Sequence, residues 1–246
     1  NEKPKGMAEF YIYHDVGAIQ EDDNQQGLAH FLEHMAFNGT KNYPDNKLRE
    51  YLESIGVKFG ANLNAFTSWD LTQYFMTDVP IARESVIDSA LLVLHDWSHF
   101  ITLDPKEIDA ERGVIQEELR TSETASWRAQ IKMIKALGKG TLYEDRNLIG
   151  YLDGLASFTY DDIREFYHKW YRPDYQTVVV VGDIDVDKVE QKIKTIMADI
   201  PAPAADAAKK DVIVVPDNDE PIVSVNADPE MQQSNLMIFY KSQAMP

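Results

Sequence analysis

Two histidines four residues apart lie in an otherwise apolar segment of the sequence. His30 and His34, with Glu33 beside them, are surrounded by Leu28, Phe31, Leu32, Met35 and Phe37. The spacing of the apolar residues predicts a helix over about 27–37, ended by Asn38-Gly39. Residues four apart share one face of a helix. We therefore expect a polar stripe on a buried helix, where ionisable groups need a partner or a metal.

This stripe has the composition of a catalytic zinc site. Imidazole nitrogen is a preferred zinc ligand, and catalytic zinc keeps three protein ligands and a water. His30 and His34 supply two ligands, and Glu33 is placed to take a proton from a metal-activated water. The chain contains no cysteine, so only His, Asp or Glu can hold a metal. The alternative interpretation is a pair of core histidines beside a chance glutamate.

A second segment offers the missing carboxylate ligand. Residues with the spacing of one helical face are Ile108, Glu111, Ile115 and Glu118. Two carboxylates therefore occupy positions where a core-facing helix should be apolar. Either Glu111 or Glu118 can complete the ligand set, whereas Glu117 points about 100° away and should face solvent. The alternative is an amphipathic helix with surface glutamates.

A competing histidine pair lies further along the chain. His95 and His99 are also four residues apart, with Asp96 beside the first. They come at the C-terminal end of an expected helix, where histidines interact favourably with the helix dipole. Because the matching face carries no flanking carboxylate, we expect structural or surface roles for this pair.

The order of the expected elements indicates an α+β fold, a mainly antiparallel sheet with helices packed on it. Strands are expected at 7–19, 57–66, 70–79 and 175–181. Further helices are expected at 44–55, 81–98, 104–121, 125–137, 160–170 and 186–198. Asp104 should cap its helix, with Pro105 at the first helical position.

The last part of the chain has a different composition. A stretch rich in proline and alanine at 201–210 reads as a linker. Strand-like pieces follow at 211–215, 221–226 and 235–241. We therefore expect a catalytic domain over 1–200, a linker over 201–210, and the opening strands of an incomplete domain over 211–246.

Composition excludes several classes of partner. The formal net charge of −17 argues against nucleic acid, because phosphate binding needs clustered Lys and Arg. No run of eighteen apolar residues exists, so no transmembrane segment is expected. The first residues lack the apolar region of a signal peptide and look like a chain that begins part-way. The compartment cannot be read from them.

Several ordered motifs together resemble the insulinase/pitrilysin family of zinc peptidases, the inverzincins. Residues 27–41 read GLAHFLEHMAFNGTK, and residues 60–68 read GANLNAFTS. Residues 111–118 read ERGVIQEE, and YRP at 171–173 is followed by VVVVGDI at 178–184. The resemblance covers nearly the whole chain and is nearest to bacterial members of the family.

The resemblance implies a role for each motif residue. His30 and His34 would be ligands of one Zn²⁺ per catalytic domain, and Glu33 the base that activates the water. Glu118 would be the third ligand, with Glu111 supporting the site from behind. The interval from His34 to Glu118 is longer than is usual in the family, and Glu111 would fit by counting alone. The local pattern Glu-Arg-x-x-Ile-x-x-Glu favours Glu118.

The resemblance also implies where a peptide substrate would bind. Asn64, Ala65, Phe66 and Thr67 look like the edge strand that pairs with substrate backbone. Phe37 and Phe66 would line a side-chain pocket. Family enzymes enclose the substrate between two similar halves, so the expected partner is a second half or a homologous subunit. By resemblance, the location is the bacterial periplasm or cell envelope.

Three functions follow from these features. The first is a zinc-dependent endopeptidase, of which this chain alone has little activity because the second half is missing. The second is a non-catalytic zinc-binding member of the family that acts as a structural or interaction subunit. Such members usually lose a motif residue, and here all are present. The third is a structural zinc domain, for which no fourth ligand is evident.

Overall fold

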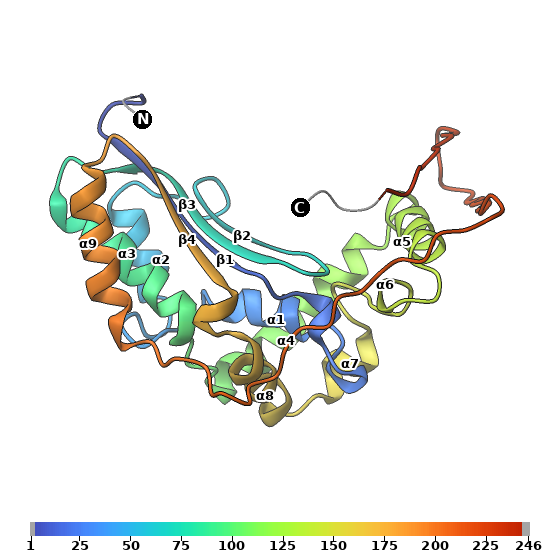
Figure 1. Cartoon of the computed structure of the whole chain (residues 1–246), viewed down its shortest axis with the longest axis horizontal. Helices are drawn as coiled ribbons and strands as arrows, with labels where there is room; N and C mark the ends of the chain where they lie inside the picture. Colours follow the sequence, from blue (N-terminus) through green and yellow to red (C-terminus); the bar gives the residue numbers. More distant parts are fainter. Residues whose placement is uncertain (1–2, 243–246) are drawn as a thin grey trace.

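The computed structural model describes residues 3–242 and is an α+β fold (Figure 1). Its sheet consists of β1 (Met7–His14), β2 (Leu63–Thr67), β3 (Thr72–Pro80) and β4 (Gln176–Gly182). The strand order is β2-β3-β1-β4, and every neighbouring pair is antiparallel. The expected fold class is therefore confirmed.

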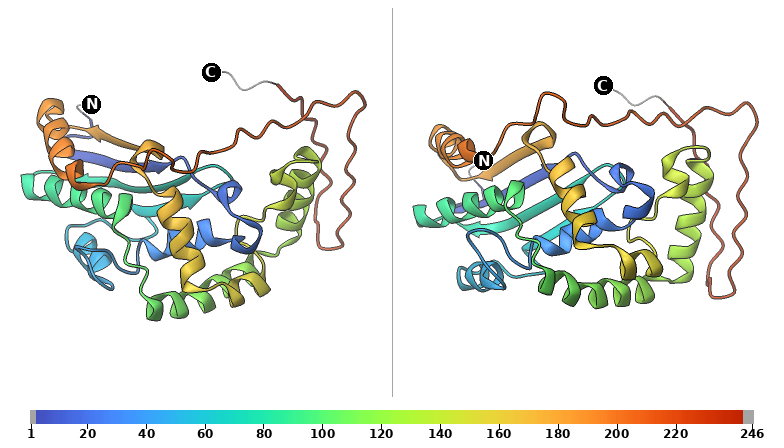
Figure 2. Two further views of the ribbon diagram at one scale, coloured as in Figure 1. Left: turned by 60° about the horizontal axis from the view of Figure 1, so that its bottom comes forward. Right: turned by 90° about the horizontal axis from the view of Figure 1, so that it is seen from below.

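The helices lie between and after the strands in the chain, and only some of them pack on the sheet. They are α1 (Leu28–Met35), α2 (Lys47–Ser54), α3 (Glu84–His99), α4 (Pro105–Ser122), α5 (Ala125–Leu137), α6 (Leu142–Asp145), α7 (Leu152–Ser157), α8 (Tyr160–Trp170) and α9 (Val186–Ile196). Figure 2 shows α1, α3, α4 and α8 on the same side of the sheet. The core of the protein lies between these helices and the sheet.

Residue pattern explains why these elements form. Along β1, half-buried and buried residues alternate, which is the period of a strand with one face on a core. Asp104 caps α4 by accepting the Lys106 amide at 2.8 Å, and Pro105 is the first helical residue, as expected. Thr159 and Asp162 form a capping box at the start of α8.

The core fixes the end of α1 to its neighbours. Trp97 of α3 is fully buried, and its indole N–H donates to the Ala36 carbonyl at 3.0 Å. Its ring stacks on Tyr74 of β3 at 5.4 Å between centroids. Since α3 also packs along β1, the sheet and α3 together set where α1 lies. Burial of such large aromatic side chains contributes roughly 2–3 kcal/mol each.

Two strands and one helix are shorter than their patterns predict. The helix expected over 44–55 spans only Lys47–Ser54, because Asp45 has a φ of +53°, outside the helical range. The strand expected from 57 begins only at Leu63, because the Lys58 carbonyl accepts the amides of Asn62 and Leu63 and closes a turn. The strand expected over 7–19 ends at His14, and Ala18–Gln20 forms a 3₁₀ turn. Hydrophobic period finds an element more reliably than its end.

The segment after Asp199 does not form the expected strands. Among residues 200–242 the structure assigns no helix or strand, and residues 243–246 lie outside the described part. Apolar side chains of the expected strands, such as Val225 and Tyr240, are exposed. An extended segment becomes a strand only beside a partner strand. The segment runs past α5, where Arg128 pairs with Asp228 at 2.7 Å (Figure 1). The division into domains stays a prediction.

The helices are also too short or too polar for a bilayer. Across residues 3–242, none has the length and apolar character needed to cross a membrane.

Candidate active site

The polar stripe of α1 lies at the edge of the core. The apolar side of the helix is buried through Leu28, Ala29, Phe31, Leu32 and Met35. The side chain of His30 is 14% exposed and that of His34 is 23% exposed. The apolar flanks predicted a stripe buried inside the protein, but in the structure the stripe reaches the surface. A catalytic metal needs this opening, because one coordination position must stay accessible.

Helix α4 crosses α1 and brings carboxylates to the stripe. Ile108 and Ile115 are fully buried, which fixes the rotation of α4. Glu111 and Glu118 lie on the same face and contact α1, whereas Glu117 is exposed, as expected.

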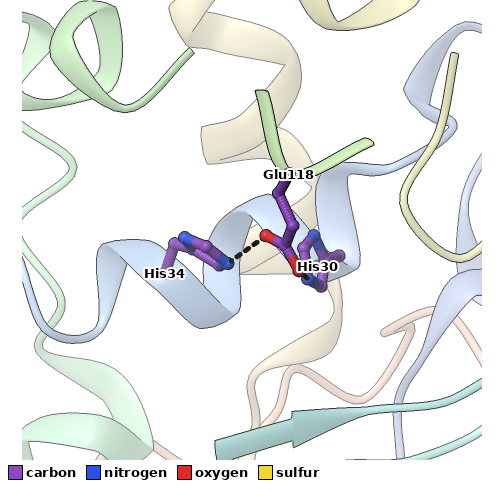
Figure 3. Close-up of side chains that lie close together, drawn as sticks. All are labelled: His30, His34 and Glu118. Carbon is purple, nitrogen blue, oxygen red and sulfur yellow. Dashed lines mark ion pairs between the residues drawn. The ribbon is translucent and has the colours of Figure 1, made fainter. Parts of the chain in front are cut away.

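Glu118 lies between the two imidazoles (Figure 3). Its Oε1 is 3.6 Å from His30 Nε2, and its Oε2 is 3.3 Å from His34 Nε2. The three ligand atoms lie within 4.8 Å of one another. A tetrahedral zinc bound at about 2.0–2.1 Å places its ligand atoms about 3.3–3.4 Å apart. The two carboxylate–imidazole separations are close to this value, and two imidazole nitrogens with one carboxylate oxygen are suitable ligands for Zn²⁺.

Glu111 contacts the other side of one histidine. Its Oε1 lies 2.8 Å from His34 Nδ1, and its Oε2 accepts from Asn38 Nδ2 at 2.5 Å. This arrangement leaves Nε2 of His34 facing Glu118. From sequence, Asn38 was expected only to end α1. No local signal could have indicated its bond to a residue on another helix.

Burial and the neighbouring carboxylates control the ionisation of these groups. Burial lowers the pKa of His30 to about 4, with the His34 charge acting in the same direction. Burial also disfavours charge on His34, but hydrogen bonds to Glu111 and Glu118 outweigh it and raise its pKa to about 9. The hydrogen bond from His34 in turn lowers the pKa of Glu118. A metal must displace the His34 proton, so metal affinity should rise with pH.

Glu33 is held against β2. Its Oε2 accepts from the Thr67 hydroxyl at 2.5 Å. Burial raises the pKa of Glu33, and the Thr67 hydrogen bond opposes that rise. A carboxyl whose pKa moves toward neutrality suits general acid–base work.

The residues expected to bind substrate fall into two groups, exposed residues on β2 and residues that are wholly or partly buried. β2 is an edge strand, because apart from a single bridge between Phe59 and Leu63 only β3 pairs with it among the described residues. Phe66 is 53% exposed on this strand, and Asn64 is also exposed. Ala65 is half-buried and Thr67 is buried against Glu33. Phe37 is buried too, in edge contact with Phe59 and Trp97.

Comparison with known families decides the classification. The family model for insulinase, peptidase family M16, matches residues 1–148, more than half of the chain. The chain belongs to the insulinase family of peptidases. A second family model, for the inactive domain of peptidase M16, matches residues 157–245.

Individual members of the insulinase family are similar to this chain in sequence and in fold. The probable zinc protease PqqL of Escherichia coli is 40% identical over 199 residues, 81% of this chain and 21% of that protein. A zinc protease PQQL-like protein of Arabidopsis thaliana is 32% identical over 242 residues, 98% of this chain and 25% of that protein. The crystal structure of the first half of the periplasmic protease PqqL from Escherichia coli matches with a TM-score of 0.81 and 38% identity. That match covers 87% of this chain and 45% of that structure.

The chain therefore spans between a fifth and a quarter of the length of these curated insulinase-family proteins. The sequence HFLEH, His30 to His34, lies within the part of the chain that the insulinase family model matches.

Proposed function

We propose that this chain forms the metal-binding catalytic domain of a zinc-dependent endopeptidase. The observation that carries the proposal is the convergence of Glu118 from α4 on His30 and His34 of α1. The carboxyl group of Glu33 lies on the same helix and is available as a base. In this proposal His30, His34 and Glu118 hold Zn²⁺, and Glu111 orients His34 through its Nδ1.

Each residue of the site has a distinct task. Zinc, when bound, supplies a water with a pKa near neutrality and polarises the scissile carbonyl. Glu33 takes a proton from the attacking water and delivers it to the leaving amine. Thr67 holds Glu33 at the end of β2 through its hydroxyl. By accepting from Nδ1, Glu111 keeps the Nε2 of His34 free as a ligand atom.

The unpaired edge of β2 is the proposed place for the peptide backbone. An extended substrate adds a strand there, with Asn64, Ala65 and Phe66 facing it and Thr67 linking the strand to the base. Phe66 offers an exposed ring to a substrate side chain, and Phe37 supports this region from the core through Phe59.

The remaining part of the proposal concerns the rest of the protein. A second half, or a homologous subunit, would close over this edge and complete the substrate chamber, as in two-half relatives. The location is the bacterial periplasm, by likeness to the periplasmic relative. This chain alone would bind zinc but cleave peptides weakly.

Glu33→Gln tests the proposal, in this chain and in the full reading frame that contains it. The variant keeps the size of the side chain but cannot accept a proton. We expect unchanged zinc content and a loss of peptide cleavage of about 10²–10⁴-fold in the full protein. Glu117→Gln, the same change on the exposed face of α4, is the matched control and should leave both unchanged.

Three results would contradict parts of the proposal. Wild-type cleavage by the Glu33→Gln variant refutes the role of the base. Absence of zinc from the wild-type chain at saturating metal refutes the ligand set. A full protein that binds zinc but cleaves no peptide supports the non-catalytic alternative instead.

A further inference from the structure

The metal-binding helix has an unusual start. Its N-cap residue is Gly27, which has φ +94° and no side chain to cap the helix. A Cβ at Gly27 would lie 2.8 Å from both the Ile149 carbonyl oxygen and the Cα of Gly150. Side chains such as Ser, Thr, Asp or Asn normally accept the free amides of the first turn. The close approach of the 149–150 backbone excludes all of them here.

The carboxyl group of Glu21 accepts hydrogen bonds from the first-turn amides in place of an N-cap side chain. Glu21 lies in the polar loop before the helix, and its side chain reaches two of the free amides. Its Oε2 accepts from the Gly27 amide at 3.0 Å, and its Oε1 accepts from the Ala29 amide at 2.8 Å. Glu21 is only 2% exposed. Both carboxyl oxygens are therefore committed to the first turn of α1.

The loop that carries Glu21 is itself fixed. The buried guanidinium of Arg146 donates to the Glu21 carbonyl at 2.8 Å and to Asp23 at 3.0 Å. Glu21 is thus fixed both at its side chain, by the bonds to the Gly27 and Ala29 amides, and at its backbone, by the bond from Arg146. Burial raises the pKa of Glu21 to about 8, against the opposing effect of the Ala29 and Gly27 amides. Keeping an ionisable group here costs stability, which a purely packing role does not require.

The two histidines of the site differ in how they are held. Glu111 orients the imidazole of His34 through Nδ1. Within residues 3–242, His30 Nδ1 is buried and has no hydrogen-bond partner. No hydrogen bond at Nδ1 fixes the His30 ring, so its orientation depends on packing and on the position of its backbone. His30 is the third residue of α1 and lies in the turn that Glu21 fastens.

We infer that Glu21 is the positioning residue for His30, acting through the first-turn amides of α1 as Glu111 acts directly on His34. The inference rests on the metal site proposed above. The Glu21 side chain acts by holding the Gly27 and Ala29 amides in place, and with them the first turn that carries His30. Its loss should therefore weaken metal binding in a protein that still folds.

The test compares Glu21→Gln and Glu21→Ala with wild type in this chain. Glutamine is isosteric, but its amide group turns a donor toward one of the two N–H groups. The zinc dissociation constant is measured by competition with a chelator, and Co²⁺ is used as a spectroscopic probe of ligand geometry. We expect zinc affinity to fall about 10–100-fold, the range for residues that orient a ligand, with a changed Co²⁺ absorption spectrum. Glu21→Gln is used if the alanine variant does not fold.

Asp185→Ala is the matched control. Asp185 caps α9 by accepting the Lys188 amide at 3.1 Å, and α9 carries no residue of the site. This variant should lose stability without a change in zinc affinity or in the Co²⁺ spectrum. Folded Glu21 variants with wild-type zinc affinity and spectrum would overturn the inference and leave the proposed function intact. A wild-type chain that does not bind zinc would overturn both.

Discussion

Two pairs of histidines with the same spacing have different surroundings in this protein. His30 and His34 on α1 direct their Nε2 atoms toward one carboxylate of another helix, Glu118. His95 and His99 on α3 have separate partners. His95 lies between Asp96 and Asp199, at 3.1 and 2.7 Å, and His99 Nδ1 lies 3.0 Å from the Tyr171 carbonyl oxygen.

The difference teaches what spacing alone can and cannot specify. Four-residue spacing puts two imidazoles on one helical face, and both pairs satisfy that condition. Only the first pair faces a helix whose buried face also contains carboxylates. In the second pair, both ring nitrogens of His95 are already bound to protein carboxylates, and Asp96 also accepts from Thr40 and the Asn42 amide. The structural role expected for this pair agrees with these contacts.

The largest predicted effect separates the two pairs by alanine substitution. His34→Ala removes a ligand and should weaken zinc binding by more than about 100-fold, beyond the loss typical of supporting residues. His95→Ala should leave zinc affinity unchanged. It should lower the free energy of unfolding by about 1–3 kcal/mol, because Asp96 loses a buried hydrogen-bond partner.

Zinc titration and urea unfolding of the metal-free chain measure the two quantities. Equal zinc affinity in His34→Ala and wild type would remove the distinction between the pairs. So would loss of zinc in a folded His95→Ala variant.

The two glutamates of α4 should also differ in how much their loss weakens zinc binding, but by less than the two histidine pairs differ. Glu118 lies beside both Nε2 atoms, whereas Glu111 contacts only Nδ1 of His34. The Glu118→Gln variant should therefore no longer bind one zinc ion per chain at micromolar zinc concentrations. Glu111→Gln should weaken binding by about 10–100-fold, as loss of a residue behind a ligand does. Zinc lost with Glu111→Gln but kept with Glu118→Gln would reverse the assignment.

Much of this comparison could be predicted from the sequence. The apolar period around His30 and His34 gave the helix, and the 3-4-3 spacing from Ile108 gave the face of α4 that meets it. The helix limits at Ala125–Leu137 and Tyr160–Trp170 agree with the expected ranges. These features depend on residues close in the chain, where hydrophobic period and caps act.

Contacts between distant segments could not be predicted. Glu21 reads as part of a polar loop, and its capping role arises only because the 149–150 backbone forces a glycine at Gly27. Thr67 was expected to contact substrate, but nothing in the sequence indicated that its hydroxyl also bonds Glu33. Strands expected after the linker lack partners among the described residues, and local pattern says nothing about pairing.

The smallest predicted effect is the pH dependence of the second pair. Burial opposes charge on His95, but the hydrogen bonds to Asp96 and Asp199 raise its pKa above the usual value. A histidine with a raised pKa in the folded state stabilises the fold fully below its unfolded pKa, about 6.5. That stabilisation is lost as pH rises through the folded pKa. The stability gap between wild type and His95→Gln should therefore narrow as the pH rises from about 6 into the alkaline range.

Urea unfolding of the zinc-free wild type and variant across this pH range measures the gap. Taking the difference in unfolding free energy between the two proteins cancels the contributions of titrating groups that both share. The change should be modest, because Asp199 is more than half exposed and solvent screens its charge. Asp199→Asn is the matched control, since it removes one partner of His95 and should reduce the pH dependence without abolishing it. A gap that is constant or widens with pH would show that His95 is neutral in the fold, and the second pair would then be held by uncharged hydrogen bonds alone.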